Sequence, residues 1–162
     1  MAEYEDFEQG SEPNWIDCTN DYLHLTGGPN PLHHRIPRVR KDSKFAEIGL
    51  FLAIDKDTRI IAGSAGFHDF PDERGMIEIG YGIVPEMQGR GLGKELLLAA
   101  WKWVLEYPNV KVLRYTVSES NDISLHIIQS LGFDFVGQQI DETDGPEQIY
   151  EMAVESFRKN FS

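Results

Sequence analysis

The residues with the clearest chemical potential form a glycine-rich stretch, QGRGLGK, at positions 88–94. It lies between a strand-like run, 76–84, and a run with helical spacing, 94–106. A glycine-rich turn between a strand and a helix presents several backbone N–H groups at the helix N-terminus, where anions and above all phosphates bind. The sequence therefore predicts a phosphate-binding loop.

Two common phosphate-loop patterns do not fit this stretch. The P-loop pattern G-x-x-x-x-G-K-[ST] would place its first glycine at Gln88 and its Ser/Thr at Glu95, so the hydroxyl that binds magnesium is missing. The Rossmann fingerprint G-x-G-x-x-G/A fails at Lys94. It also follows the first strand of its fold, whereas several predicted strands precede this loop.

A third pattern, Q/R-x-x-G-x-G/A, matches QGRGLG at 88–93 in every position. GIVP at 82–85 precedes it, and NDIS at 121–124 and LGF at 131–133 follow it. With these motifs in this order, the chain from about residue 45 to residue 154 resembles the GNAT N-acetyltransferase superfamily. The resemblance implies that the loop binds the pyrophosphate of acetyl-CoA, the co-substrate.

The candidate cofactor-binding residues combine this loop with the end of the preceding strand and the second motif. They are Gly82, Ile83, Val84, Gln88, Gly89, Arg90, Gly91, Leu92, Gly93, Lys94, Asn121 and Ser124. Amides of the loop can surround the pyrophosphate, the helix dipole favours its charge, and glycines permit the close approach. A tight turn with a glycine N-cap is the alternative that needs no ligand.

Acetyl transfer to an amine needs a neutral amine, a polarised thioester carbonyl and a protonated leaving thiolate. The resemblance implies direct attack in a ternary complex, so Cys18 is not needed as a nucleophile and is expected to be a packing residue. A backbone N–H at Ile83 or Val84 could polarise the carbonyl. Asn121 could bond the pantetheine arm or act only as a helix N-cap.

Many relatives carry a tyrosine, the general acid, seven residues after this asparagine, where the chain has Ile128. The second motif instead resembles the ribosomal-protein N-terminal acetyltransferase branch, in which a serine at the Ser124 position is implicated near the thiol. Ser124 is therefore a catalytic candidate, although its side chain could equally bond the capping backbone.

Glu78 is the best candidate for the base that removes the amine proton. It lies on the 76–84 strand with the phase opposite to Ile77 and Ile79, and partial desolvation would raise its pKa. A structural hydrogen bond is the alternative. Second choices near the acceptor are His68, Asp69 and Tyr81, whereas His126 is expected on the surface and Glu119 in a solvated loop.

Length and composition place broad limits on the protein. At 162 residues we expect one domain, with a core at 45–155 and a poorly matched segment at 1–44. A net charge of −12 argues against nucleic acid and permits a cationic partner such as an amine, or simply serves solubility. One cysteine is too little for a metal site and fits a reducing compartment. With no signal pattern and no bilayer-spanning apolar run, a cytoplasmic protein without membrane contacts is expected.

The periodicity predicts a mixed α/β fold, and the resemblance implies a GNAT-like, mostly antiparallel central sheet with a splayed strand and flanking helices. Predicted strands cover 45–54, 59–67, 76–84, 110–117, 133–140 and 148–154, and predicted helices cover 94–106 and 121–131. A turn at 55–58, a loop at 68–75 and an acidic turn at 141–145 connect them. In the first helix, the expected buried face is Leu97, Ala100, Trp101 and Val104, widened by Leu96 and Trp103.

The first 44 residues are harder to interpret. They hold a candidate helix at 15–25, a Gly/Pro loop at 27–31 and a basic patch at 33–41, where Pro37 argues against a continuous helix. The patch is expected to be a solvated loop, but it could touch CoA phosphate or form a homodimer contact. Two other functions stay open: a non-catalytic acyl-CoA-binding module, and a transferase of a larger acyl group such as succinyl.

Overall fold

The computed structural model describes residues 17–28, 30–141 and 145–161. Contacts divide the chain into two compact units, one of Met1–Gly66 with Tyr81–Leu97 and one of Phe67–Gly80 with Leu98–Ser162. Within the described ranges a six-stranded sheet has the order β1-β2-β3-β4-β6-β5. The strands are β1 (Phe51–Ile54), β2 (Ile61–Phe67), β3 (Met76–Ile83), β4 (Val112–Ser118), β5 (Asp134–Asp141) and β6 (Gly145–Ala153).

Strand pairing confirms the predicted mixed α/β class. The pairs β1–β2, β4–β6 and β5–β6 are antiparallel, and β3–β4 is parallel. From β1 onward the strands and the two predicted helices follow in the predicted order β-β-β-α-β-α-β-β. The predicted helices are α4 (Leu92–Val104) and α5 (Asp122–Ser130), and each begins or ends within two residues of its predicted bounds.

The splayed strand is β3. Its ladder with β4 joins Met76–Ile79 to Val112–Tyr115 and ends there, although β3 continues to Ile83. Beyond Tyr115, strand β4 continues to Ser118 with β6 as its partner. Residues 80–83 of β3 therefore lie beyond the end of its ladder with β4.

In the first unit, the predicted hairpin is confirmed. Strands β1 and β2 pair across a turn in which the Asp55 carboxylate accepts hydrogen bonds from the N–H groups of Asp57 (3.1 Å) and Thr58 (2.9 Å). The Thr58 hydroxyl donates to the same oxygen at 3.0 Å. This side-chain capping is typical of Asp at the start of a turn.

The predicted strand at 45–54 is wrong in its first half. A 3-10 turn, η1 (Ser43–Phe45), and a short helix, α3 (Ala46–Gly49), precede β1. The Asp42 carboxylate caps this segment by accepting from the N–H of Lys44 at 3.0 Å. A Cβ added at Gly66 would collide with the carbonyl of Gly49, so the helix end lies directly against β2. Tertiary contact here overrides the β propensity of the residues.

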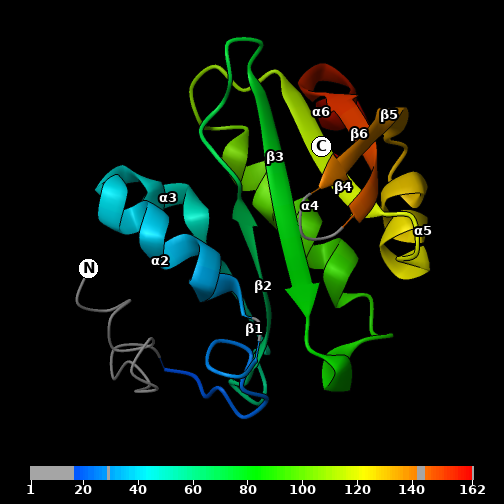
Figure 1. Ribbon diagram of the computed structural model, residues 1–162. Helices are drawn as coiled ribbons and strands as arrows, with labels where there is room; N and C mark the ends of the chain where they lie inside the picture. Colours follow the sequence, from blue (N-terminus) through cyan, green and yellow to red (C-terminus); the bar gives the residue numbers. More distant parts are fainter. Residues whose placement is uncertain (1–16, 29, 142–144, 162) are drawn as a thin grey trace. The chain divides into compact units, whose positions relative to one another are not determined.

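The basic patch is a helix and not a loop. Helix α2 (Pro31–Lys41), cyan in Figure 1, contains Pro37 and starts with the Asn30 side chain accepting from the N–H of Leu32 at 3.0 Å. Three apolar side chains of α2 are buried, which offsets the backbone hydrogen bond lost at Pro37. They are Leu32, Ile36 and Val39.

Further contacts explain the rest of the N-terminal segment. The Arg38 guanidinium lies 4.3 Å from the centre of the Phe45 ring, so the last turn of α2 is held by a cation–π contact. The predicted helix at 15–25 is wrong over residues 17–25, which form turns and one bridge from Thr19 to Ile60. Cys18 packs against the cluster that contains Leu25, which confirms its packing role.

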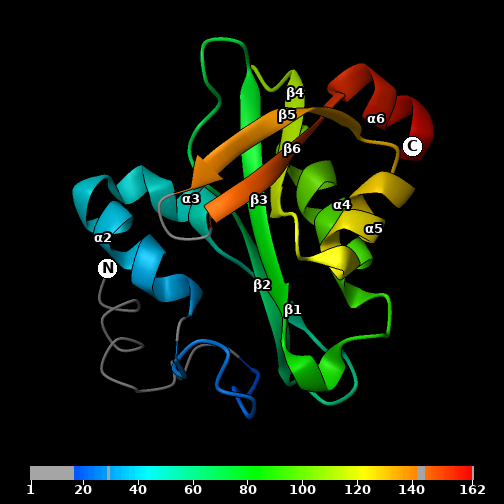
Figure 2. The same ribbon diagram turned by 45° about the vertical axis from the view of Figure 1, so that its right-hand side comes forward.

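The second unit is built around an aromatic cluster. The Trp101 ring of α4 stacks on Phe133, with centroids 4.6 Å apart, and meets the edge of Phe157 at 6.1 Å. Phe157 belongs to α6 (Val154–Phe161), a C-terminal helix that was not predicted. Figure 2 shows β5 and β6 side by side, with β6 leading into α6. Of the predicted acidic turn, residues 142–144 lie outside the described residues.

The buried face of α4 is confirmed except at its margin. Leu97, Trp101 and Val104 are fully buried, and Ala100 and Leu96 nearly so, whereas Trp103 is 43% exposed. Trp103 instead stacks at the surface on Phe67, with ring centroids 6.5 Å apart.

This difference yields a matched pair of variants. Trp101→Ala should lower the free energy of unfolding by about 3–5 kcal/mol, because it removes a fully buried ring and leaves a cavity. Trp103→Ala should lower it by at most about 1 kcal/mol, since that ring is half in water. Urea denaturation of both variants measures the difference. Equal losses would contradict the assignment of α4's buried face.

Candidate active site

The glycine loop leads into α4 as predicted. A single turn, η2 (Pro85–Met87), connects β3 to the loop. Gly89 and Gly91 have φ angles of +73° and +80°, which only glycine adopts without strain. A Cβ added at either position would meet no atom within 4 Å, so the loop borders open space at both glycines.

Gln88 holds the loop to the end of β3. Its side-chain Nε2 donates to the carbonyl of Ile83 at 2.9 Å. Below the loop, Met87 and Val84 are buried in a small cluster with Ala62, and the N–H of Met87 donates to the carbonyl of Val84 at 3.0 Å. The first residue of the motif therefore positions the loop by a tertiary hydrogen bond.

Arg90 is tied to the hairpin turn. Its Nη1 lies 2.9 Å from the Met87 sulfur and its Nη2 lies 3.4 Å from Asp55 Oδ2. Hydrogen bonds from Thr58 are the main cause that lowers the pKa of Asp55, with the charge of Arg90 as a smaller contribution. Further along the loop, Lys94 is half-buried in the first turns of α4.

Backbone hydrogen bonding at the end of β3 distinguishes the two N–H groups, of Ile83 and Val84, that could polarise a carbonyl. The N–H of Val84 donates to the carbonyl of Ala62 on β2 at 2.9 Å, so this amide is engaged in sheet pairing. Ile83 lies one residue earlier, beyond the point where the β3–β4 ladder ends. Of the two predicted donors, Ile83 is the one that the geometry favours.

The second motif forms the start of α5. The Asn121 side chain accepts from the N–H of Ser124 at 3.1 Å, which confirms Asn121 as the N-cap. Ser124 is buried, with 7% of its surface exposed, and Gly132 ends the helix with a φ of +79°. Ile128, at the position of the relatives' tyrosine, is fully buried in the core.

Glu78 is an ionised carboxylate on β3. His68 Nδ1 lies 3.4 Å from Glu78 Oε1. Burial acts to raise the pKa of Glu78, but the contact with His68, the nearby Thr116 hydroxyl and the charges of His68 and Arg114 outweigh it, so the pKa lies below its ordinary value. The expected raised pKa is therefore wrong, because the sequence did not show which neighbours offset the desolvation.

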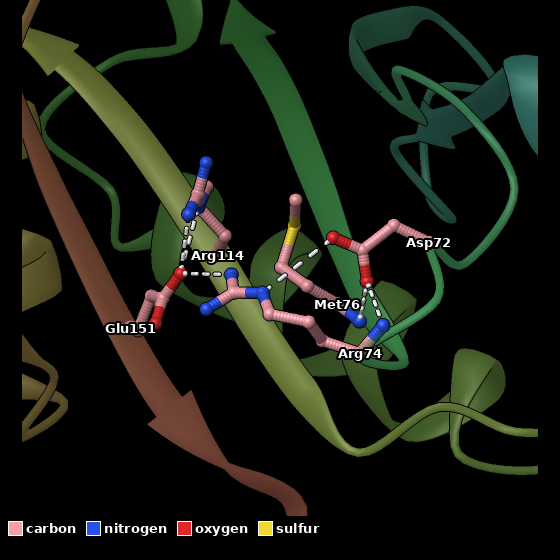
Figure 3. A network of polar contacts seen from close by, with 5 residues as sticks. All are labelled: Asp72, Arg74, Met76, Arg114 and Glu151. Atoms are coloured by element: carbon pink, nitrogen blue, oxygen red, sulfur yellow. Dashed lines mark hydrogen bonds and ion pairs between the residues drawn. The ribbon is translucent and has the colours of Figure 1, made fainter.

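Glu78 is the first member of a row of charges across the sheet. Arg114 on β4 stands in register with Glu78 on β3 and with Glu151 on β6, so the three side chains share one face. Arg114 donates to Glu151 at 2.6 Å, and Arg74 donates to the same oxygen at 3.1 Å (Figure 3). Asp72 in turn accepts from the N–H of Met76 at 2.8 Å, at the start of β3.

The structure also describes the remaining residues that the sequence analysis considered. Asp69 accepts from the N–H of Phe70 at 2.8 Å, and Tyr81 is half-buried on β3. His126 is exposed on α5, which confirms the predicted surface position. Glu119 lies in an exposed loop, where it accepts from Gln138 at 2.5 Å.

One polar pair was not predicted. His24 Nε2 lies 2.8 Å from the Ser64 hydroxyl, and burial lowers the pKa of His24. His24 falls within the wrongly predicted helix, and no motif surrounds it. Among the described residues, no group of three or more His, Cys, Asp or Glu side chains could hold a metal ion. In the same part of the chain, no helix is long and apolar enough to cross a bilayer.

Comparison with protein families identifies the class. The acetyltransferase (GNAT) domain matches residues 20–134, more than half of the chain. The chain therefore belongs to the GNAT acetyltransferase family, and by class it is an acyl-CoA-dependent N-acetyltransferase. Comparison with curated proteins finds no match.

Solved structures share this fold at low sequence identity. A chimera of the spermidine N-acetyltransferase SpeG from Vibrio cholerae and hSSAT is 15% identical, with 97% of this chain and 96% of that chain covered and a TM-score of 0.69. The ribosomal-protein-S5-alanine acetyltransferase from Vibrio fischeri is 16% identical, with 76% and 70% covered and a TM-score of 0.64. A GNAT acetyltransferase from Bacillus anthracis is 19% identical, with 70% of each chain covered and a TM-score of 0.59.

The charge balance at Glu78 leads to a titration experiment. His68→Leu removes the side chain that most opposes the burial penalty, so the pKa of Glu78 should rise. Carboxyl carbon NMR titration measures this shift, with His126→Leu as the control at an exposed histidine. In the parent protein the pKa of Glu78 in the folded state lies below its unfolded value of 4.5, so the ionised carboxylate stabilises the fold fully above pH 4.5. This stabilisation is lost as the pH falls through the folded-state pKa. An unchanged pKa in His68→Leu would contradict this account.

Proposed function

We propose that the protein transfers an acetyl group from acetyl-CoA to a primary amine by direct attack in a ternary complex. The observation that carries this proposal is the loop at 88–93, which combines the full motif with two positive-φ glycines that border open space. Backbone N–H groups at a helix N-terminus favour a doubly charged pyrophosphate by hydrogen bonding and by the helix dipole.

The cofactor would lie along residues of the loop and of β3. In this proposal Gly89, Gly91 and Gly93 give the pyrophosphate access to the backbone, and Arg90 and Lys94 add positive charge. Leu92 begins the helix whose dipole faces the phosphates, while Gln88 acts through its bond to Ile83. Gly82, Ile83 and Val84 form the strand end along which the pantetheine arm would run.

The thioester end of the cofactor requires a donor for its carbonyl and a proton for the thiolate. We assign the carbonyl to the N–H of Ile83, because that of Val84 is bonded to Ala62. In the second motif, the Asn121 oxygen is used by the helix cap, which leaves the amide nitrogen of the side chain to donate to pantetheine. Ser124 is the proposed group near the thiol.

The acceptor in this proposal is an amine that is protonated in solution. Spermidine and an alanine of ribosomal protein S5 are the acceptors named for two proteins of the same fold, and spermidine carries primary amines. A carboxylate with a lowered pKa is a weak base but a good partner for an ammonium group. Glu78, first considered as the base, is therefore better suited to hold the ammonium before it loses its proton.

Acetyl-CoA should stabilise the protein against heat. A ligand at 100 times its Kd that binds only the folded state adds about 2.7 kcal/mol, which corresponds to a rise in Tm of roughly 5–10 °C for a chain of this size. Differential scanning fluorimetry with acetyl-CoA and with CoA measures the shift. An unchanged Tm at saturating acetyl-CoA would contradict the proposal, and binding without thiol release on any amine would favour a non-catalytic module.

Gly91→Glu should abolish CoA binding while the protein stays folded. The new side chain would place a negative charge where the pyrophosphate binds, and the positive φ adds a strain of about 1–2 kcal/mol. Gly145→Glu is the matched control, because Gly145 has a φ of +76° and equally open surroundings. Calorimetric titration with CoA should show normal affinity in the control. Normal affinity in Gly91→Glu would move the cofactor site elsewhere.

A further inference from the structure

A histidine and a serine meet beside the end of β3 in the first unit. His24 Nε2 lies 2.8 Å from Ser64 Oγ, and Ser64 on β2 is 4% exposed. The His24 Cε1 lies 3.9 Å from the position that a Cβ on Gly82 would occupy. The imidazole therefore lies over β3 at Gly82, next in sequence to Ile83, the proposed donor to the thioester carbonyl.

The turn that carries His24 is held in place from both sides. Asn20, 4% exposed, accepts from the N–H of Leu25 at 3.3 Å and donates to the Thr26 hydroxyl at 3.1 Å. Leu25 is 1% exposed and belongs to the core cluster of this unit. A further bond closes the turn, from the N–H of Gly27 to the carbonyl of Leu23 at 2.7 Å. His24 is thus presented by a closed turn that is anchored in the core.

The surroundings of the ring favour its neutral form. Burial lowers the pKa of His24 from the ordinary value of 6.5, and among the described residues no charged side chain contributes to that shift. The ring contacts the Ser64 hydroxyl and lies beside Gly82, and both of these residues are uncharged. At neutral pH the imidazole is therefore uncharged, and this is the form that can accept a proton.

We propose that His24 is the general base that removes the proton from the acceptor ammonium, with Ser64 as the residue that positions its ring. This inference rests on the proposed acetyl transfer. In this proposal the imidazole is the Nε2–H tautomer, which donates to the Ser64 hydroxyl and leaves Nδ1 as the proton acceptor. The N–H bond of the ammonium breaks and the Nδ1–H bond forms, and the imidazolium later returns this proton to solvent. The neutral amine attacks the thioester carbonyl, so that the C–N bond forms and the C–S bond breaks, and the leaving CoA thiolate takes up the second proton that the nitrogen loses.

The test compares His24→Gln, Ser64→Ala and, as control, His33→Gln, which alters an exposed histidine on α2. Thiol release is measured with spermidine and with a peptide that begins with alanine. At pH 7, His24→Gln should lose about 100-fold in kcat, with the KM for acetyl-CoA and the acetyl-CoA-induced rise in Tm unchanged. Ser64→Ala should show a smaller loss, and His33→Gln none.

The pH profile separates catalysis from a structural role. In the parent protein, kcat/KM should fall at acidic pH through a limb below 6.5, where His24 becomes protonated. In His24→Gln that limb should disappear, and activity should recover as the pH approaches 9, because more of the amine is then neutral in solution. An active His24→Gln variant with the parent's profile would overturn the inference.

A binding measurement keeps the inference testable even if neither amine is acetylated. The Cε1–H resonance of His24 is followed during titration with each amine in the presence of CoA. An amine that reaches the base should shift this resonance and leave that of His33 unchanged. A normal response to acetyl-CoA with no shift of the His24 resonance would overturn the role of His24 alone, whereas a missing response to acetyl-CoA would refute the proposed transfer itself.

Discussion

The constraint on which the proposed chemistry depends is the early end of the β3–β4 ladder. Pairing ceases at Ile79 and Tyr115, although β3 continues to Ile83. Directly after β3, the N–H of Val84 donates to the carbonyl of Ala62 on β2, and the Gln88 side chain donates to the carbonyl of Ile83. The backbone of β3 is thus held on one edge and at its end, so a rigid strand end can serve as a binding edge for an extended ligand.

Electrostatics distinguishes two partly buried titratable groups, one in each unit. The pKa of Glu78 is lowered because His68, Thr116 and Arg114 outweigh its burial, whereas that of His24 is lowered by burial, and no charged side chain among the described residues opposes this. A carboxylate that attracts an ammonium group and an imidazole that accepts its proton are complementary roles. Both roles follow from the different environments of two partly buried side chains.

The prediction from sequence succeeded where the determining contacts are local. The loop at 88–94, the Asn121 cap, the Gly132 helix end and the buried face of α4 all follow from residues within a few positions of one another. It failed at α2 and α3, where burial of apolar side chains and the close approach of Gly49 to Gly66 override Pro37 and the β propensity of 45–50. It missed α6, although Val154, Phe157 and Phe161 have helical spacing.

By itself, the sequence determined the family and the glycine loop ahead of α4, because both depend on short motifs whose spacing is a property of the chain. Only the tertiary structure decided the chemistry of the candidate groups. The pKa of Glu78 is lowered mainly by His68, 10 positions earlier, and less by Arg114, 36 positions later, and the ring of His24 contacts Ser64, 40 positions away. A pKa is set by burial and by neighbours in space, and neither can be read from the residues adjacent in sequence.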